Sequence, residues 1–179
     1  MRGATTAYIV GNSNKFKRVS TNGNLPTIDT FDSGLNISGL EIDGGDERPA
    51  YRPIQSIRIF IIGFKLYGQG GSSTVNRLNI YNTSTSLLEV QSDLTSQNVN
   101  AGDPNDESSA TEVLFSFATP HTLAANTTFH FEVLRSGSGV NAMITDQNNE
   151  SEIFHIDTSG PNTVSENDPV MRVFGQVKS

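Results

Sequence analysis

The stretch SIRIFIIGFKLY, residues 56–67, decides the fold of this chain. Side chains alternate between the two faces of a β-strand, so Ile57, Ile59 and Ile61 would lie on one face. The stretch as a whole is apolar on both faces, which is expected when both sides of a strand are covered. It therefore predicts a long strand in the centre of a β-sheet.

The apolar positions of this stretch change phase at a glycine. Beyond Gly63 the strongly apolar residues are Phe64 and Leu66, at even positions. One extra residue in a strand moves all later side chains to the opposite face, and this is the effect of a β-bulge. We therefore expect a bulge at Gly63.

Shorter strand-like runs follow, and turn-forming residues separate them. Residues 68–73 (GQGGSS) predict a turn because glycine adopts positive φ at little cost, and residues 93–109 predict a long polar loop. About eight short strands joined by turns are typical of an all-β sandwich or barrel. After residues 56–67, the expected strands are residues 75–81, 87–90, 112–117, 127–134, 140–145, 152–156 and 170–177.

The alternation within these runs also predicts the core. Apolar side chains at every second position of a strand share one face, and that face would point inward. Their burial together would supply most of the driving force for folding. The predicted core consists of Ile57, Ile59, Ile61, Phe64, Leu66, Leu78, Ile80, Phe115, Phe117, Phe129, Phe131, Val133 and Val173.

The composition favours strands and turns over helices. The chain of 179 residues contains 20 Ser, 17 Thr, 17 Asn and 16 Gly, and these residue types disfavour helix interiors. We therefore expect neither a helical bundle nor a doubly wound α/β enzyme. The sequence has no cysteine, which excludes disulfides and thiolate metal sites.

Charge and hydropathy argue against two classes of partner. The net charge is −7 and the isoelectric point is about 4.8, whereas nucleic-acid-binding surfaces are usually basic. The sequence has no run of 18 apolar residues, so we expect no membrane-spanning helix. Its first 18 residues also lack the apolar region of a signal peptide.

The composition divides the chain near residue 50. Residues 1–50 are rich in Asn, Gly, Ser, Thr and Asp and hold only short apolar runs, too few for an independent core. They predict an extended N-terminal arm with short strands, and residues 51–179 predict one β-sandwich domain. Pro49 and Pro53 flank the boundary, where proline resists continuation of regular structure.

The predicted arm differs from the rest of the chain in charge. Residues 1–28 carry a charge of +4 and residues 29–179 a charge of −11, which together give −7. A segment that cannot pack alone becomes ordered on a partner. We expect the arm to dock on a neighbouring protein; a solvated tail and a nucleic-acid contact are the alternatives. The predicted contact residues are Arg2, Lys15, Phe16, Lys17 and Arg18.

Acidic residues gather in the polar loop. Calcium prefers six to eight oxygen ligands, which acidic loops rich in Gly and Asn can supply. The spacing does not match an EF-hand loop, so an ordinary solvated turn is favoured and a calcium site is the alternative. The predicted Ca²⁺ ligands are Asp103, Asn105, Asp106 and Glu107, and no other cofactor is expected.

The sequence shows no pattern typical of catalysis. His121, His130 and His155 stand apart from other metal ligands, and no G-x-S-x-G motif is present. We therefore expect no catalytic residue and no enzyme. A sugar-binding site would need an aromatic ring, and Tyr67 and Tyr81 are the candidates in a chain without tryptophan.

Two stretches resemble a known architecture. Residues 115–131 (FSFATPHTLAANTTFHF) resemble the strand, Pro-x-x-Leu, strand hairpin of jelly-roll modules, and residues 168–175 (DPVMRVFG) resemble their last strand. Such modules are similar to the galactose-binding-like β-sandwiches of phage virion accessory and tail proteins and of bacterial surface proteins. The resemblance covers roughly residues 54–177 and implies an antiparallel jelly-roll β-sandwich.

The resemblance and the oppositely charged arm imply a structural role. We expect a bacteriophage virion protein, either a capsid decoration (cement) protein or a fibre-type accessory, that binds capsid or tail subunits through its arm and one sandwich face. Modules of this kind often form symmetric homo-oligomers, and a trimer is favoured. The alternative is a carbohydrate- or receptor-binding module on an extracellular surface, with calcium as its ion.

Overall fold

The computed structural model describes residues 26–29, 36–145, 152–158 and 168–178. Of these residues, 69% lie in β-strands and none in an α-helix, which confirms the all-β prediction. No helix among them is long and apolar enough to span a membrane. The elements are β1 Pro26–Asp29, β2 Asn36–Glu41, β3 Glu47–Tyr51, β4 Ile57–Asn82, β5 Leu87–Gln91, β6 Gln97–Val99, the 3-10 turn η1 Glu107–Ser109, β7 Thr111–Leu123, β8 Phe129–Thr145, β9 Ile153–Asp157 and β10 Met171–Val177.

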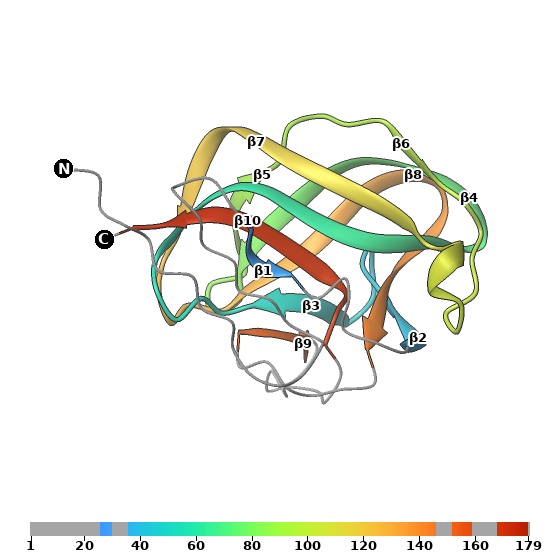
Figure 1. Cartoon of the computed structure of the whole chain (residues 1–179), viewed down its shortest axis with the longest axis horizontal. Helices are drawn as coiled ribbons and strands as arrows, with labels where there is room; N and C mark the ends of the chain where they lie inside the picture. The colour runs from blue at the N-terminus through green and yellow to red at the C-terminus, as the bar shows by residue number, and fades with distance from the viewer. Residues whose placement is uncertain (1–25, 30–35, 146–151, 159–167, 179) are drawn as a thin grey trace.

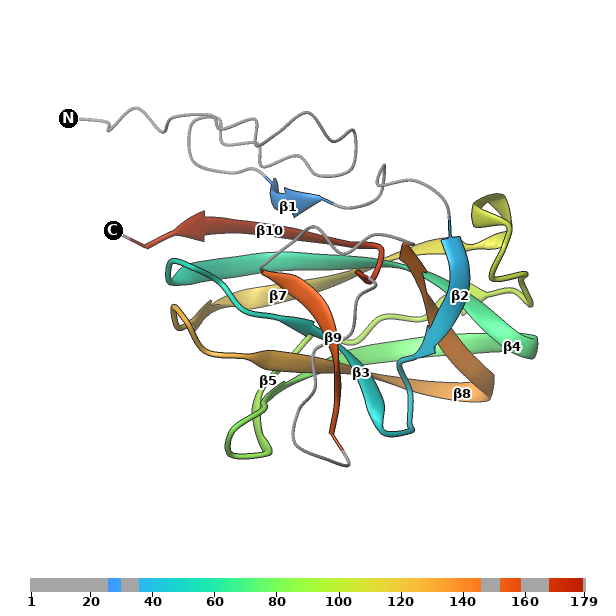
Figure 2. The same ribbon diagram turned by 90° about the horizontal axis from the view of Figure 1, so that it is seen from below.

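All ten strands belong to one antiparallel sheet, and this sheet curls until two of its parts face each other (Figure 1). The first layer consists of β1, β10, β7 and residues 57–66 of β4. The second layer consists of β3, β5, β6, β9, residues 73–82 of β4 and the first half of β8. Figure 2 shows the two layers lying over each other.

β4 and β8 connect the layers because each turns a corner. Residues 68–73 were predicted to be a turn that separates two strands, but β4 continues through them. Its pairing with β8 skips from Gln69 to Ser73, and Gly70 has a φ of 74°. The glycine-rich stretch therefore bends one long strand from the first layer into the second.

The core lies between the layers. Phe64 of the first layer and Phe131 of the second meet edge to face, with ring centroids 5.5 Å apart, a favoured geometry for aromatic pairs. Twelve of the thirteen predicted core residues are buried. Ile61 is the exception, since it is half-buried and outside the core cluster.

The misplaced Ile61 comes from the position of the bulge. The consecutive β10 residues Phe174 and Gly175 pair with Ile61 and Ile59 of β4, so the extra residue of β4 is Phe60 rather than Gly63. The change of face therefore occurs three residues earlier than expected, and Ile62 takes the buried position. The bulge also leaves two consecutive apolar residues, Phe60 and Ile61, outside the core.

Residues 36–51 belong to the sheet, although we expected residues 1–50 to form an arm. β2 pairs with β8, and β3 pairs with both β8 and β9. Leu40, Ile42 and Ala50 are buried. Short apolar runs that cannot form a core of their own can still add to another core, and our argument from insufficient apolar surface overlooked this. Residues 1–25 lie outside the described residues, so an arm confined to them stays a prediction.

Candidate binding surfaces

The corner at which β4 and β8 bend requires glycine. Gly137 has a φ of 103°, and a Cβ atom there would lie 2.9 Å from the Ser72 carbonyl oxygen. A Cβ atom on Gly71 would collide with the Ser138 side chain. The two backbones can therefore approach this closely only because side chains are missing at these positions.

A hollow of about 460 Å³ opens at this corner. Two hydrogen bonds fix its wall: Ser73 Oγ donates to the Ser136 carbonyl oxygen at 2.8 Å, and Thr74 Oγ1 donates to Asn98 Oδ1 at 3.1 Å. Apart from one glycine, every lining residue carries a hydroxyl or an amide. The lining residues are Ser72, Ser73, Thr74, Asn98, Asn100, Ser136 and Gly137. The hollow therefore offers uncharged hydrogen-bonding groups.

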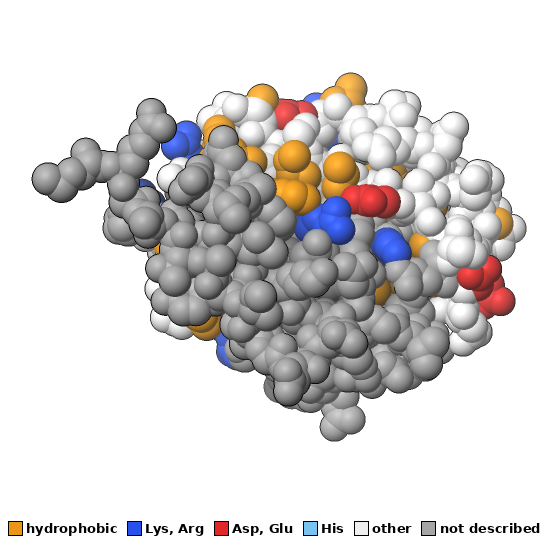
Figure 3. All heavy atoms as spheres, viewed as in Figure 1, with side chains coloured by type: hydrophobic (Ala, Val, Ile, Leu, Met, Phe, Trp, Pro, Cys, Tyr) orange, Lys and Arg blue, Asp and Glu red, His pale blue; other side chains and the backbone are white. Residues whose placement is uncertain are grey.

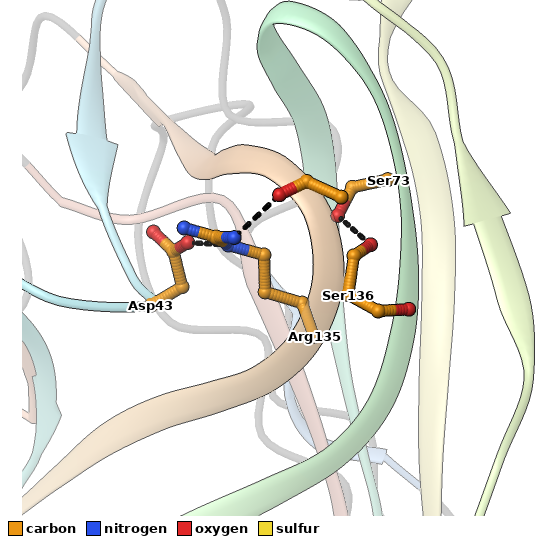
Figure 4. Close-up of polar contacts among 5 residues, drawn as sticks. Asp43, Ser73, Arg135 and Ser136 are labelled. Atoms are coloured by element: carbon orange, nitrogen blue, oxygen red, sulfur yellow. Dashed lines mark hydrogen bonds and ion pairs between the residues drawn. The ribbon is translucent and has the colours of Figure 1, made fainter.

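Arg135 supports the corner from one side. It forms an ion pair with Asp43, and its Nη1 donates to the Gly137 carbonyl oxygen at 2.6 Å. Figure 4 shows Arg135 between Asp43 and the corner. The Asp43 side chain is 1% exposed, and a buried carboxylate needs such a partner. The pair therefore ties the turn after β2 to the bend in β8.

The outward face of the second layer carries a hydrogen-bonded cluster, which we call the polar strip: Asn79, Tyr81, Gln91, His130 and Glu132. The Tyr81 and His130 rings stack with centroids 5.2 Å apart and an angle of 14°. Asn79 Nδ2 donates to Tyr81 Oη at 3.0 Å, and Gln91 Nε2 donates to Asn79 Oδ1 at 2.7 Å. Most of these polar groups therefore bond to one another.

Burial sets the protonation states in the polar strip. It lowers the pKa of His130, the Arg48 guanidinium lowers it further, and Glu132 acts in the opposite direction. Burial likewise raises the pKa of Tyr81, and a hydrogen bond to Glu132 adds to the rise. Both rings are therefore uncharged at neutral pH.

The structure treats the two candidate sugar-binding tyrosines differently. Tyr67 is 4% exposed, packs with Met143 and Val170, and accepts a hydrogen bond from Asn141 Nδ2 at 3.1 Å. Burial raises the pKa of its hydroxyl. Its ring therefore has no exposed face on which a sugar could stack, and Tyr67 is no longer a candidate sugar-binding residue. Tyr81 is half-buried, but its stack with His130 covers one ring face.

The predicted calcium loop is closed by hydrogen bonds of its own. Asp103 Oδ1 accepts from the Asn105 amide at 2.8 Å, and Asp106 Oδ1 accepts from the Ser108 amide at 3.0 Å. Within the described part of the chain, no three His, Cys, Asp or Glu side chains come together as metal ligands. The Glu107 side chain is not described. Calcium binding here therefore stays a prediction.

The outward face of the first layer carries a surface that the sequence analysis missed, which we call the cationic face: Arg58, Phe60, Ile61, Leu114, Arg172 and Phe174. The Arg58 guanidinium lies over the Phe60 ring at 5.9 Å, and that of Arg172 over the Phe174 ring at 5.7 Å. Figure 3 shows hydrophobic side chains beside cationic and acidic ones over β4, β7 and β10. Part of the signal was present in the sequence, since all of these residues except Ile61 alternate with the core positions of three strands.

The residues predicted for the arm contact lie outside the described residues. They are Arg2, Lys15, Phe16, Lys17 and Arg18. The structure therefore shows three separate candidate surfaces: the hollow, the polar strip and the cationic face. The arm contact stays a prediction.

Two comparisons of this chain with known proteins found no match. A scan of protein-family models found no match to this chain, and a search of curated proteins found none either. The jelly-roll resemblance rests on residues 115–131 and 168–175 alone. Residues 115–131 were expected to form a hairpin, but β7 pairs with β4, and β8 pairs with β2, β3 and β4. Function therefore has to be argued from the surfaces.

Proposed function

We propose that this chain is a structural protein of a virion, a capsid decoration or fibre-type accessory, and that it is not an enzyme. Its body would be a jelly-roll β-sandwich, and its cationic N-terminal segment and one face of the body would bind neighbouring capsid or tail subunits. The bacteriophage virion is then its location, and a homo-oligomer, with a trimer favoured, its assembly.

The separation of charge along the chain carries this proposal. Residues 1–28 hold a charge of +4, and residues 29–179 hold −11. The segment is attached at β1, which pairs with β10 at one end of the sheet. A cationic segment anchored at a sheet edge suits an acidic neighbour, because opposite charges both steer and orient the encounter.

The proposed mechanism is clamping. The N-terminal segment would bind one neighbouring subunit while the body contacts another, so that separating the two would require breaking both contacts. Linking two weak contacts in one molecule strengthens the whole, since the second contact forms at a high effective concentration. The contacts must also offset the entropy lost when the segment becomes ordered.

Deleting residues 1–25 tests the proposal. The buried residues Leu40, Ile42 and Ala50 remain in this variant, so we expect a folded protein by circular dichroism and thermal melting. We also expect it to lose co-sedimentation with virions purified from the source. Normal decoration by the truncated protein would show that the segment is not a clamp.

A charge variant separates the role of charge from that of length. Replacing Lys15, Lys17 and Arg18 with glutamine should weaken virion binding about tenfold or more, because three attractive charges are lost. The matched control removes three cations from the body, for which Arg52, Arg77 and Lys178 are suitable. Equal losses in the two variants would indicate a nonspecific effect of net charge.

The hollow favours a second candidate function, carbohydrate or receptor binding. Its hydroxyl and amide lining matches the hydrogen-bonding needs of a neutral sugar. A glycan array tests this: saturable binding to one sugar class, lost on replacing Asn98 and Asn100 with alanine but retained in Asn105→Ala, would support the idea. No binding on the array, or equal binding by all variants, would rule out carbohydrate binding in the hollow.

A further inference from the structure

We propose that the cationic face binds the loop around Asp103 and Asp106, here called the acidic loop, of a second copy of this chain. Copies would then associate head to tail. The inference rests on the proposed function only in assuming that the protein assembles. It names the surface, the partner and the chemistry of the contact. It uses only residues that the structure describes.

The cationic face has the composition of a protein-binding surface. Arg and aromatic residues are enriched at interface hot spots, and this face pairs each of two arginines with a phenylalanine. Leu114 is 39% exposed beside them. The bulge at Phe60 contributes directly, because it leaves both Phe60 and Ile61 outside the core.

The charge of the face selects an acidic occupant. Arg58 and Arg172 lie on the face, and Lys65 and Glu112 border it as a cross-strand pair. The sum of these four charges is positive, although residues 29–179 as a whole carry −11. The chain's own residues 1–25 contain cations and no acid, so like-charge repulsion disfavours them as the occupant.

The acidic loop has the complementary chemistry. Asp103 and Asp106 are exposed. Each uses Oδ1 to accept hydrogen bonds from its own loop, and Ser109 Oγ donates to the backbone carbonyls of both residues at 3.1 and 2.7 Å. The loop is therefore held in one conformation before binding. Such preorganisation reduces the entropy lost on association.

The positions of the two surfaces favour contact between copies. The loop lies beside the corner, since Ala101 bridges to Gly68, and Figure 1 shows η1 at that end of the molecule. Arg58 lies ten residues before Gly68 on the same strand, toward the other end of the first layer. A loop at one end and a face that extends to the other make a heterologous contact, which closes into a ring or continues as a fibre.

Charge reversal on each side tests the contact. We would measure the dissociation constant of self-association by sedimentation equilibrium at low salt, for the full chain and two variants. One variant combines Arg58→Glu with Arg172→Glu, and the other combines Asp103→Lys with Asp106→Lys. Each should weaken self-association about tenfold or more, and an equimolar mixture of the two should recover it.

Two further variants serve as controls for folding defects and for nonspecific charge effects. Arg58→Glu alone keeps the Arg172–Glu112 ion pair and should still weaken association, so a folding defect at Arg172 cannot account for the result. Arg52→Glu is the matched control, because Arg52 is exposed and lies over a phenylalanine, Phe154, in the second layer. It should associate like the wild type.

Three results would overturn the inference. They are a monomeric wild type over the whole concentration range, wild-type association in both reversed variants, and loss of association in the face variant but not in the loop variant. The last result would mean that the face binds something other than the loop. None of them touches virion binding by residues 1–25, which the truncation measures separately.

Discussion

The outward faces of the two layers follow the same alternation but differ in what their side chains do. On the second layer, Asn79 bonds to Tyr81 and to Gln91, so the polar strip satisfies itself. On the first layer, the Arg58 guanidinium lies over the Phe60 ring, Arg172 forms an ion pair with Glu112, and Leu114 is 39% exposed. The difference separates a face that stabilises the fold from one that we propose binds a partner.

This contrast matters because alternation alone does not distinguish the two faces. Both are read from the sequence as the half of each strand that points away from the core. Hydrogen-bond pairing between neighbouring strands decides their roles, since a buried polar group without a partner costs free energy and an exposed cation does not. The predictions below test that division.

The largest effect is expected in the contact that joins the layers. Phe131→Ala should lower the free energy of unfolding by about 3–5 kcal/mol, because it removes a fully buried ring and leaves a cavity against Phe64. Phe174→Ala, on the cationic face, should cost about 1 kcal/mol or less. Urea denaturation compares the two, and equal losses would show that the outward ring is as structural as the inward one.

A smaller effect is expected at the corner. Gly137→Ala should cost about 1–3 kcal/mol, because it forces a side chain into positive φ and against the Ser72 carbonyl oxygen. Gly70 also has positive φ, but a Cβ atom there meets nothing within 4 Å, so Gly70→Ala should cost less. The difference in melting temperature between the two variants measures the cost of the contact with the Ser72 carbonyl oxygen. Identical melting temperatures would contradict it.

The general architecture could be predicted from the sequence because it depends on local signals. Period-2 alternation identified all but one of the chosen core residues and most strand positions from residue 57 onward. The expected strands 56–67 and 75–81 are one strand, β4, the expected strands 127–134 and 140–145 are one strand, β8, and β6 lies in the expected loop 93–109. A bulge was expected at Gly63 but lies at Phe60, because its position is fixed by the pairing of β4 with β10 and not by a local preference for positive φ.

Long-range pairing limited the rest. Nothing local in residues 36–51 shows that they pair with β8 and β9, more than 75 positions further along the chain. For the same reason Tyr67 appeared available for a ligand, although Met143 and Val170 cover it. The cationic face was readable in principle, since Arg58 and Arg172 alternate with core positions, but only the pairing of β4 with β10 brings them together.

A substitution on the polar strip should lower the free energy of unfolding by about 1 kcal/mol or more beyond the effect of one on the cationic face. Asn79 is 5% exposed and bonds to two neighbours, so Asn79→Ala should cost about 1–3 kcal/mol by removing its hydrogen bonds to Tyr81 Oη and Gln91 Nε2. Arg58→Gln should stay within about 0.5 kcal/mol of the wild type. Chemical denaturation distinguishes them, and a costly Arg58→Gln would place the cationic face among the stabilising contacts.

The smallest effect concerns pH. The folded pKa of His130 is lowered by burial and by Arg48, so the unfolded chain takes up a proton first as pH falls below about 6.5. The stability that the neutral ring contributes is complete above that value and is lost as pH falls toward the folded pKa. His130→Gln should therefore lose less stability than the wild type between pH 7.5 and 5.5. Parallel losses would show that other groups carry the pH dependence.

Chemical cross-linking of native virions tests the central claim most directly. An amine-reactive reagent would label Lys15 and Lys17 in the N-terminal segment, and mass spectrometry would identify what they reach. We expect links from these lysines to a capsid or tail subunit. Links confined to the same chain, or virions that lack the protein altogether, would contradict the account.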